Sequence, residues 1–373
     1  MRICFVTHKV IKGDGQGRVN YEVMVEAIRQ GHEITVISAE LSDELRNHSQ
    51  VKWIRINMRK IPTLLLRYQA FALLSAIWLW SHRKHIDLTV VNGFITYARS
   101  DINCIHFVHS AWVKSEYHPF REKKNLKTLY QYIYNRLNAS LERFAMKRTK
   151  HIISVSEQVK RELAGDAKIE PSRISVITNG VDLDEFYPRS MSRKDYQLDE
   201  NKVYALFAGD LRSSRKNLDT VLHALVKVEN IHLLVLGYTE KSSYPKLAET
   251  LGLSDRVHFL GYRKNVAELM SLVDLFIFPS RYEPFSLVVL EAMASGLPVI
   301  TSSKCGAVEL LSEDSAVVME DPDDTERLVH ILNELLFNKE RLKIMSKRAR
   351  EVARKHTWGN MAEKYLRLIH STR

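Results

Sequence analysis

The chain has 373 residues, of which 45% are hydrophobic and 27% are charged, and its formal net charge is +11. This composition excludes a disordered chain, and the length favours two domains over one. The three cysteines are too far apart for a metal-binding spacing or a disulfide framework, which is typical of a reducing compartment, and the positive charge predicts an acidic partner.

Short apolar segments alternate with helical patterns, which predicts an α/β fold with parallel sheets. In the first half we expect a strand at residues 2–7, then a glycine loop and a helix from about Arg18. Residues 64–80 form an apolar run that contains Arg67 and Gln69, and we interpret it as a buried or partly interfacial helix because a spanning helix needs about twenty apolar residues. The other strands expected in this half are 33–38, 51–56, 88–92, 105–109, 152–155 and 174–177.

A second alternating series begins after the Asn-Gly turn at Asn179, near the middle of the chain. The last fifty residues have a mostly helical pattern. Two α/β halves joined near residue 180 are therefore predicted, with a ligand site in a cleft beyond the carboxyl ends of the strands. The strands expected in the second half are 204–208, 232–236, 257–260, 274–278 and 298–301.

The most informative segment is E-P-F-S-L-V-V-L-E, from Glu283 to Glu291. It follows a predicted strand and begins a helix, and a helix N-terminus has free N–H groups and partial positive charge that suit a phosphate. Two carboxylates beside a phosphate site indicate a ligand that also presents hydroxyl groups. A nucleotide sugar has both features.

These stretches resemble the retaining glycosyltransferases of family 4, which have the GT-B fold: two Rossmann-like domains whose parallel sheets face each other across a cleft. The resemblance covers nearly the whole chain and is most specific in S-R-Y-E-P-F-S-L-V-V-L-E-A-M-A-S-G-L-P-V-I. The loop G-D-L-R-S-S-R-K-N-L and the segments V-I-T-N-G-V-D and V-S-E-Q-V are less specific. It implies an acceptor-binding domain at 1–180, a nucleotide-sugar domain at 181–355, and a terminal helix at 356–373 that packs back on the first domain.

The resemblance also implies roles for the residues of the two-glutamate segment. Glu291 would accept hydrogen bonds from both ribose hydroxyls, and Glu283 would contact the transferred sugar. The backbone amides of Phe285, Ser286 and Leu287 would hold the distal phosphate. Many relatives have glycine where this chain has Ser286.

The loop at 209–217 is expected to supply cations that stabilise the departing diphosphate. Lys216 aligns with the family's lysine. The arginine that usually follows the glycine is replaced by Asp210, so Arg212 or Arg215 would take its place, and we favour Arg212.

Four residues of the first half are candidates by the same resemblance. Gly15 and Gly17 would border the donor phosphates and the acceptor, Arg18 would contact phosphate or acceptor, and His109 would touch the transferred sugar. The alternatives are an ordinary turn for the glycines and a packing role for the histidine.

Much of the positive charge lies in residues 112–150, which contain ten Lys or Arg residues against three acidic residues. A helical apolar stripe and several aromatic residues accompany these cations. The segment is similar to surfaces that bind anionic lipid, although a solvated basic helix has the same pattern.

The sequence thus predicts a retaining hexosyltransferase that uses a UDP- or GDP-sugar and a glycan or lipid-linked acceptor in envelope or polysaccharide biosynthesis. We expect it in the cytoplasm, peripherally on the inner face of the cytoplasmic membrane, with no metal. The D-L-D sequence at 182–184 is interpreted as a turn, and no nucleic-acid motif is present. A sugar phosphorylase or sugar-nucleotide epimerase on the same fold, or a basic protein that binds lipid surfaces, are the alternatives.

Overall fold

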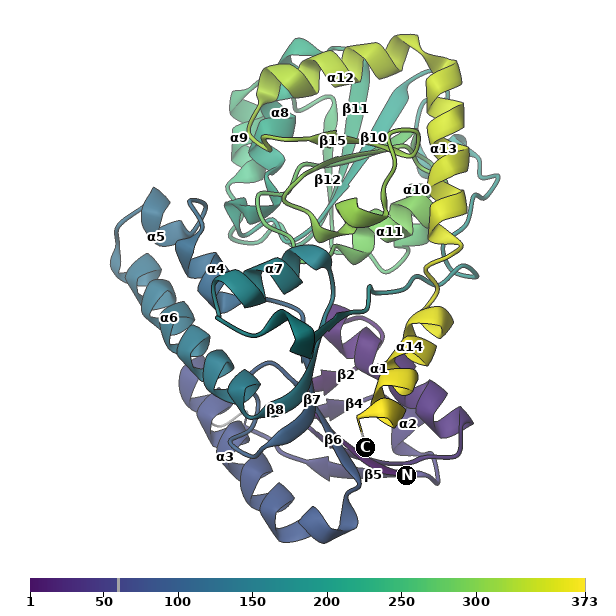
Figure 1. Cartoon of the computed structure of the whole chain (residues 1–373). Coiled ribbons are helices and arrows are strands. Elements are labelled where there is room, and N and C mark those ends of the chain that lie inside the picture. The colour runs from purple at the N-terminus through teal and green to yellow at the C-terminus, as the bar shows by residue number, and fades with distance from the viewer. Residues whose placement is uncertain (59–60, 373) are drawn as a thin grey trace. The chain divides into compact units, whose positions relative to one another are not determined.

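The computed structural model describes residues 1–58 and 61–372 (Figure 1). The chain divides into two compact units: an N-terminal unit, Met1–Gly180 with Trp358–Arg373, and a C-terminal unit, Val181–Thr357. Each unit contains one large sheet whose strands all pair in parallel. The predicted α/β class with parallel sheets is confirmed.

The N-terminal sheet has seven strands in the order β5-β3-β1-β6-β7-β8-β9. Its middle strands are apolar and buried because helices cover a parallel sheet on both faces. The strands are β1 (Arg2–Val6), β3 (Glu33–Ser38), β5 (Val51–Arg55), β6 (Leu88–Asn92), β7 (Ser100–Ile105), β8 (Thr149–Ser154) and β9 (Ile174–Val176), with a separate pair β2 (Lys9–Val10) and β4 (Glu40–Leu41).

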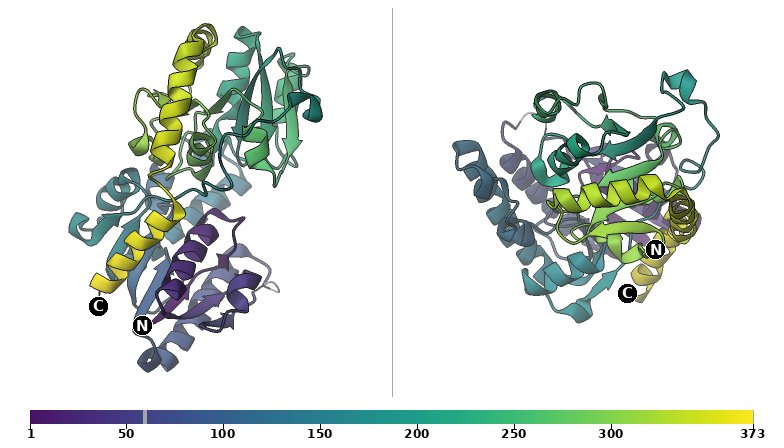
Figure 2. Two further views of the ribbon diagram at one scale, coloured as in Figure 1. Left: turned by 90° about the vertical axis from the view of Figure 1, so that its right-hand side faces the viewer. Right: turned by 90° about the horizontal axis from the view of Figure 1, so that it is seen from above.

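The last helix of the chain, α14, packs against the first helix, α1, within this unit (Figures 1 and 2). Its apolar residues, from Trp358 to Ile369, are buried. The helices of the unit are α1 (Gly15–Arg29), α2 (Asp43–Arg46), α3 (Leu64–His82) with the 3-10 turn η1 (Arg83–His85), α4 (His109–Lys114), α5 (Pro119–Glu122), α6 (Leu126–Lys147), α7 (Glu157–Gly165), η2 (Pro171–Arg173) and α14 (Trp358–Ser371).

One predicted strand, 105–109, is wrong. The strand in this region is β7, which ends at Ile105, and His109 is the first residue of α4. Polar residues in β7 hide the strand pattern, although each has a structural partner. Asp101 accepts a hydrogen bond from the Thr89 amide at 2.9 Å, and Asn103 donates to a backbone carbonyl at 3.0 Å.

The C-terminal sheet has six strands in the order β12-β11-β10-β13-β14-β15. Its strands are β10 (Val203–Ala208), β11 (Ile231–Leu236), β12 (Val257–Gly261), β13 (Leu275–Phe278), β14 (Val299–Ser302) and β15 (Ala316–Met319). The last of these was not predicted.

The described residues of this unit form six α-helices and three 3-10 turns. Asp182 forms a turn, as its side chain accepts from the amides of Asp184 and Glu185 at 3.0 and 3.2 Å. The helical segments are η3 (Arg193–Tyr196), η4 (Ser214–Lys216), α8 (Leu218–Lys227), α9 (Tyr244–Thr250), α10 (Val266–Met270), α11 (Leu287–Ala294), η5 (Gly306–Leu310), α12 (Thr325–Phe337) and α13 (Lys339–Ala353).

Candidate functional site

The loops that follow β10 and β13 meet at the carboxyl edge of the C-terminal sheet. Gly237, at the end of β11, has φ +145°, and a Cβ atom there would collide with the carbonyl oxygen of Gly209. A glycine is therefore required at Gly237 for the loop after β10 to lie in this position. The Gly209 amide also donates to the Leu236 carbonyl at 3.0 Å.

Buried Asn217 ties the first loop to the second. Its backbone is left-handed, with φ +64°, and its side-chain nitrogen donates to the carbonyls of Pro279 and Pro322 at 2.9 and 2.7 Å. The Arg215 carbonyl accepts from the Ser280 hydroxyl at 3.0 Å and from an amide at 2.9 Å. The backbone on both sides of Lys216 is thus fixed against the residues that lead to Glu283.

Lys216 and Glu283 form an ion pair in which both side chains are largely buried. Burial lowers the pKa of the Lys216 ammonium, and the adjacent carboxylate opposes that effect. Burial also disfavours ionised Glu283, but Lys216 and Arg215 outweigh it and hold the pKa of this carboxyl below its usual range. The pair is therefore a charged one, and it lies in the loops beside the N-terminus of α11.

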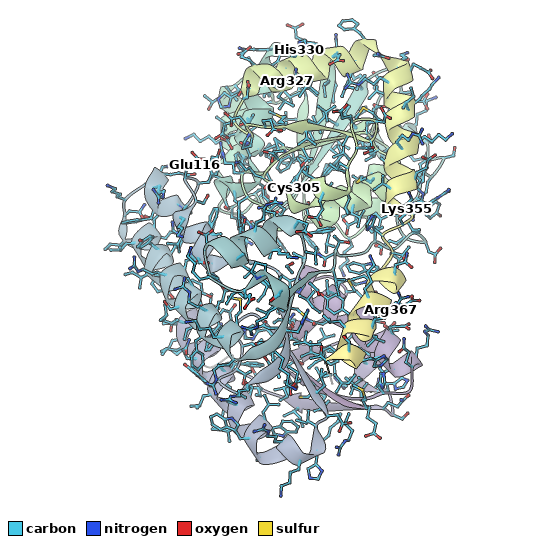
Figure 3. The ribbon with its side chains drawn as sticks, viewed as in Figure 1. Glu116, Cys305, Arg327, His330, Lys355 and Arg367 are labelled. Carbon is cyan, nitrogen blue, oxygen red and sulfur yellow. The ribbon has the colours of Figure 1, made fainter. Side chains whose placement is uncertain are left out.

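Ser286 is the N-cap of α11 and has a strained backbone, with φ +84°. Its hydroxyl is buried and has no hydrogen-bond partner in the described residues. The preceding carbonyl, of Phe285, accepts from the Ala307 amide at 2.7 Å and from the Cys305 thiol at 3.2 Å (Cys305 is labelled in Figure 3). These contacts fix the turn whose amides, with that of Leu287, begin the helix.

Replacing Ser286 with glycine should stabilise the protein. Backbone strain of this kind costs about 1–3 kcal/mol, which the glycine would relieve. The greater chain entropy of glycine in the unfolded state would offset about 0.5–1 kcal/mol of this stabilisation. We expect the melting temperature to rise by about 2–4 °C. Ser295→Gly is the matched control. Ser295 has an unstrained backbone, with φ −75°, so the same change there should destabilise the protein. A lower melting temperature for Ser286→Gly would contradict the strain.

Glu291 is the fifth residue of α11 and is partly exposed, so it lies on the helix whose first turn contains the amides described above. Of the two candidate arginines, Arg212 is bound by Asp210 through contacts of 2.8 and 3.0 Å and lies over the Tyr238 ring. The charge of Arg215, in contrast, acts on the pKa values of both Lys216 and Glu283. Arg215 therefore acts electrostatically on the ion pair, and the choice of Arg212 over Arg215 stays a prediction.

The glycine loop of the N-terminal unit leads into α1. Asp14 caps this helix by accepting from the Gly17 amide at 2.8 Å, and a Cβ atom on Gly17 would lie 3.1 Å from that side chain. Gly15 is the first residue of the helix. Arg18 pairs with Glu22 at 2.5 Å and lies over the Trp358 ring, so its guanidinium connects α1 to α14.

His109 begins α4, and its ring is held from two sides. Nδ1 is 2.9 Å from the Asn135 oxygen, and Nε2 is 3.7 Å from Glu142 Oε1. The other Glu142 oxygen accepts from the His109 amide at 3.1 Å. Burial lowers the pKa of His109 and raises that of Glu142 to about 8.

The buried carboxyl of Glu142 predicts a pH dependence of stability. The unfolded chain releases this proton near its ordinary pKa of 4.5, whereas the folded protein keeps it up to about pH 8. Because the folded state then binds more protons, the free energy of unfolding falls as pH rises between these values. Glu142→Gln should remove this fall in the free energy of unfolding. The stability of the variant relative to wild type, measured in urea melts, should therefore increase from pH 5 to pH 8. Parallel profiles would show that Glu142 is not held protonated.

Glu142 and Cys305 were not named among the candidate residues, and Arg215 was named only as the alternative to Arg212. Arg215 lies in the loop at 209–217, but Glu283, on whose pKa its charge acts, lies far away in the sequence. Glu142 lies 33 residues from His109 and has no motif of its own. Among residues 1–58 and 61–372, no group of three or more His, Cys, Asp or Glu side chains could hold a metal ion.

Two family models match adjacent parts of the chain. The model described as "Glycosyltransferase Family 4" matches residues 13–185, and the one described as "Glycosyl transferases group 1" matches residues 188–352.

Two of the curated relatives come from Escherichia coli. The lipopolysaccharide glucosyltransferase WaaG of strain K12 is 29% identical over 202 residues, which are 51% of this chain and 54% of WaaG. A UDP-Gal:alpha-D-GlcNAc-diphosphoundecaprenol alpha-1,3-galactosyltransferase is 27% identical over 278 residues, 71% of this chain and 68% of the relative. The chain thus spans about half the length of WaaG in sequence.

Solved structures extend the likeness to the whole fold. The crystal structure of WaaG has a TM-score of 0.78 at 23% identity and covers 98% of this chain and 99% of its own. Anabaena Alr3699/HepE in complex with UDP-glucose has a TM-score of 0.74 at 20% identity, with 100% of both chains covered. With two parallel sheets, of seven and six strands, the chain has the GT-B fold and belongs to glycosyltransferase family 4.

Proposed function

We propose that the protein is a retaining hexosyltransferase that transfers a sugar from a UDP-sugar to a hydroxyl group of a glycan or lipid-linked acceptor. The observation that carries this proposal is the charged Lys216–Glu283 pair beside the strained N-terminus of α11. A cation and free helix amides suit a diphosphate, and carboxylates suit sugar hydroxyls. UDP is favoured over GDP because HepE binds UDP-glucose and the galactosyltransferase relative is named for UDP-Gal.

In the proposed reaction, the bond between the sugar and the diphosphate breaks while the acceptor oxygen attacks from the same face. The acceptor's proton passes to the departing phosphate oxygen, so no residue of this chain acts as a nucleophile. Lys216, with Arg215 or Arg212, and the amides of residues 285–287 stabilise the charge that develops on the diphosphate. Catalysis is then positioning and electrostatics.

The remaining candidates position the two substrates. Glu291 binds the ribose hydroxyls, and Glu283 binds the transferred sugar. His109 is proposed to contact the same sugar from the N-terminal unit, where Gly15 and Gly17 allow a close approach of the backbone.

The names of the relatives suggest where the acceptor comes from. WaaG is a lipopolysaccharide glucosyltransferase, and the galactosyltransferase acts on a diphosphoundecaprenol-linked sugar by its name. We therefore propose an envelope or polysaccharide acceptor and a location on the inner face of the cytoplasmic membrane. Residues 112–150, which are basic and contain exposed apolar residues of α6, are the proposed contact with anionic lipid.

Thermal stabilisation by a panel of UDP- and GDP-sugars tests the donor. A ligand that binds the folded state raises the melting temperature by mass action. We expect a selective shift with one UDP-sugar, unchanged by EDTA, and a smaller shift with the same donor after Lys216→Met. The product of a reaction with lipid-linked acceptors then separates a transferase from a phosphorylase or epimerase, because only a transferase yields an acceptor glycoside. The absence of a shift from every donor, with or without manganese, would contradict the proposal.

A further inference from the structure

A cavity of about 750 Å³ lies in the N-terminal unit at the ends of α3 and α6. It borders the first residues of β7 and β8 and the second residue of β6, so it lies at the amino edge of the sheet. The glycine loop after β1 and His109 after β7 lie beyond the carboxyl edge. The cavity is therefore separate from the residues of this unit that were assigned above to donor and acceptor.

The walls of this cavity, which we name the basic pocket, carry an excess of positive charge. Both carboxylates are already paired, Asp87 with Arg2 and Asp101 with Lys150, at 2.8 Å each. Arg2 is not a lining residue. The charged lining residues are Arg83, Arg99, Lys147, Arg148, Lys150, Asp87 and Asp101. This balance suits an anionic ligand with more than one negative oxygen.

Helix α3 presents an apolar face to the outside of the unit. Large residues at helical spacing are about half exposed, and Trp80 has 57% of its surface exposed. The segment Leu64–His85 is long and apolar enough, by length and composition, to cross a membrane. However, Phe71 and Leu79 on its other face belong to the core against the sheet, which fits a helix at an interface rather than a spanning one. The exposed apolar residues of α3 are Leu64, Leu66, Leu73, Leu74, Ile77 and Trp80.

Helix α6 presents a second apolar face beside the first. The side chains of Tyr68 in α3 and Tyr134 in α6 affect each other's pKa, as neighbouring groups do, and both helices lie on one flank of the N-terminal unit (Figure 1). Tyr97 connects them again, since it bonds to Gln69 of α3 and packs edge-on against Phe144 of α6. The exposed apolar residues of α6 are Leu126, Leu129, Tyr130, Ile133, Leu137 and Phe144.

The basic pocket joins both apolar faces. Trp80 lines the pocket and also belongs to the exposed face of α3. Arg148 lines the pocket and lies 4.8 Å over the Phe144 ring of α6. Cations and exposed apolar side chains thus adjoin each other at the pocket, as they do where a protein meets the boundary between head groups and acyl chains.

We propose that the basic pocket binds the phosphate of an anionic lipid head group while the exposed faces of α3 and α6 enter the outer acyl region of the membrane. The inference rests on the proposed membrane association and extends it from residues 112–150 to α3 and its end. A lipid is favoured over a soluble phosphate because the cations adjoin a large apolar surface. It is favoured over a protein partner because the five cations match a surface of uniform negative charge.

The test is flotation of the full chain with phosphatidylcholine vesicles that contain or lack phosphatidylglycerol, at physiological salt. Arg83→Gln with Arg99→Gln removes two pocket cations that lie outside residues 112–150. Because each basic residue near an anionic surface adds about fivefold to binding, the double variant should bind anionic vesicles about tenfold or more weakly. Its stabilisation by the nucleotide-sugar donor should equal that of wild type, since neither arginine lies in the donor site.

A matched variant distinguishes this inference from the earlier proposal. Lys123→Gln, Lys124→Gln and Lys127→Gln together remove cations from the basic segment that do not line the pocket. If this triple variant weakens vesicle binding and the arginine variant does not, the pocket inference fails and the membrane association stands. If wild type does not bind anionic vesicles, both fail. Binding of inorganic phosphate with no vesicle binding, or a dimer that Ile77→Gln dissociates, would also overturn the inference.

Trp80 supplies an independent readout. Vesicles with brominated acyl chains should quench the fluorescence of the wild-type protein. Trp80→Phe should keep vesicle binding and lose part of that quenching, since Trp80 is the most exposed tryptophan, whereas Trp53 and Trp78 are partly buried and Trp112 and Trp358 are buried. Equal quenching in both proteins would place Trp80 outside the acyl region of the membrane and overturn the inference.

Discussion

Replacing Lys216 with methionine should lower turnover by about 10²–10³-fold, the usual cost of losing one group that stabilises developing negative charge. The substitution removes the buried ammonium beside the N-terminus of α11. It also leaves Glu283 as a carboxylate without this partner in a largely buried position, so the melting temperature should fall as well. Turnover is measured from nucleoside diphosphate released with the donor that the stability panel identifies.

A double variant separates the two effects of this substitution. Lys216→Met with Glu283→Gln removes both charges, so most of the lost stability should return while turnover stays low. Lys264→Met, an exposed lysine of the same unit, is the control and should change neither property. If the double variant recovers turnover along with stability, Lys216 has a structural role and no part in the chemistry.

The sequence was sufficient to predict the elements that are short, apolar and bounded by glycine or proline. Strands β3 and β6 have the bounds that were expected, and most of the others differ by one to three residues. Strand β7 was misplaced because Asp101 and Asn103 interrupt its apolar pattern. Strand β15 was missed because four residues at the edge of a sheet give too little periodicity to recognise.

The candidate site, like the fold, contains parts that could be predicted from sequence and parts that could not. The segment from Glu283 to Glu291 could be located because a strand, a loop and a helix N-terminus follow one another within it. The choice between Arg212 and Arg215 could not be made from sequence, because it depends on the pairing of Arg212 with Asp210 and on the fold of the loop. A local motif contains no information about contacts of this kind.

Distance along the chain explains the remaining omissions. Lys216 and Glu283 are 67 residues apart, and the hydrogen bonds that align them come from buried Asn217 and Ser280, which have no functional signature. In the sequence, Glu142 cannot be distinguished from an ordinary exposed charged residue on a basic helix. Only packing shows that it faces inward toward His109.

Glu291→Ala should weaken binding of the nucleoside diphosphate by about 1–3 kcal/mol, which is about 5–150-fold in Kd. The reason is loss of two hydrogen bonds from the ribose hydroxyls to one carboxylate. The fold should be unaffected because the side chain is partly exposed on α11. Isothermal titration with the diphosphate that raises the melting temperature measures the change, and Glu313→Ala, an exposed residue of the same unit, is the control.

A donor analogue without ribose hydroxyls makes this test specific. Wild type should bind the 2′,3′-dideoxynucleoside diphosphate about as weakly as Glu291→Ala binds the unmodified nucleoside diphosphate. The variant should bind the two ligands with equal affinity. This outcome assigns the lost affinity to the ribose contact, since a general disturbance of α11 would weaken both ligands equally. Equal weakening, or unchanged affinity in the folded variant, would remove Glu291 from the ribose site.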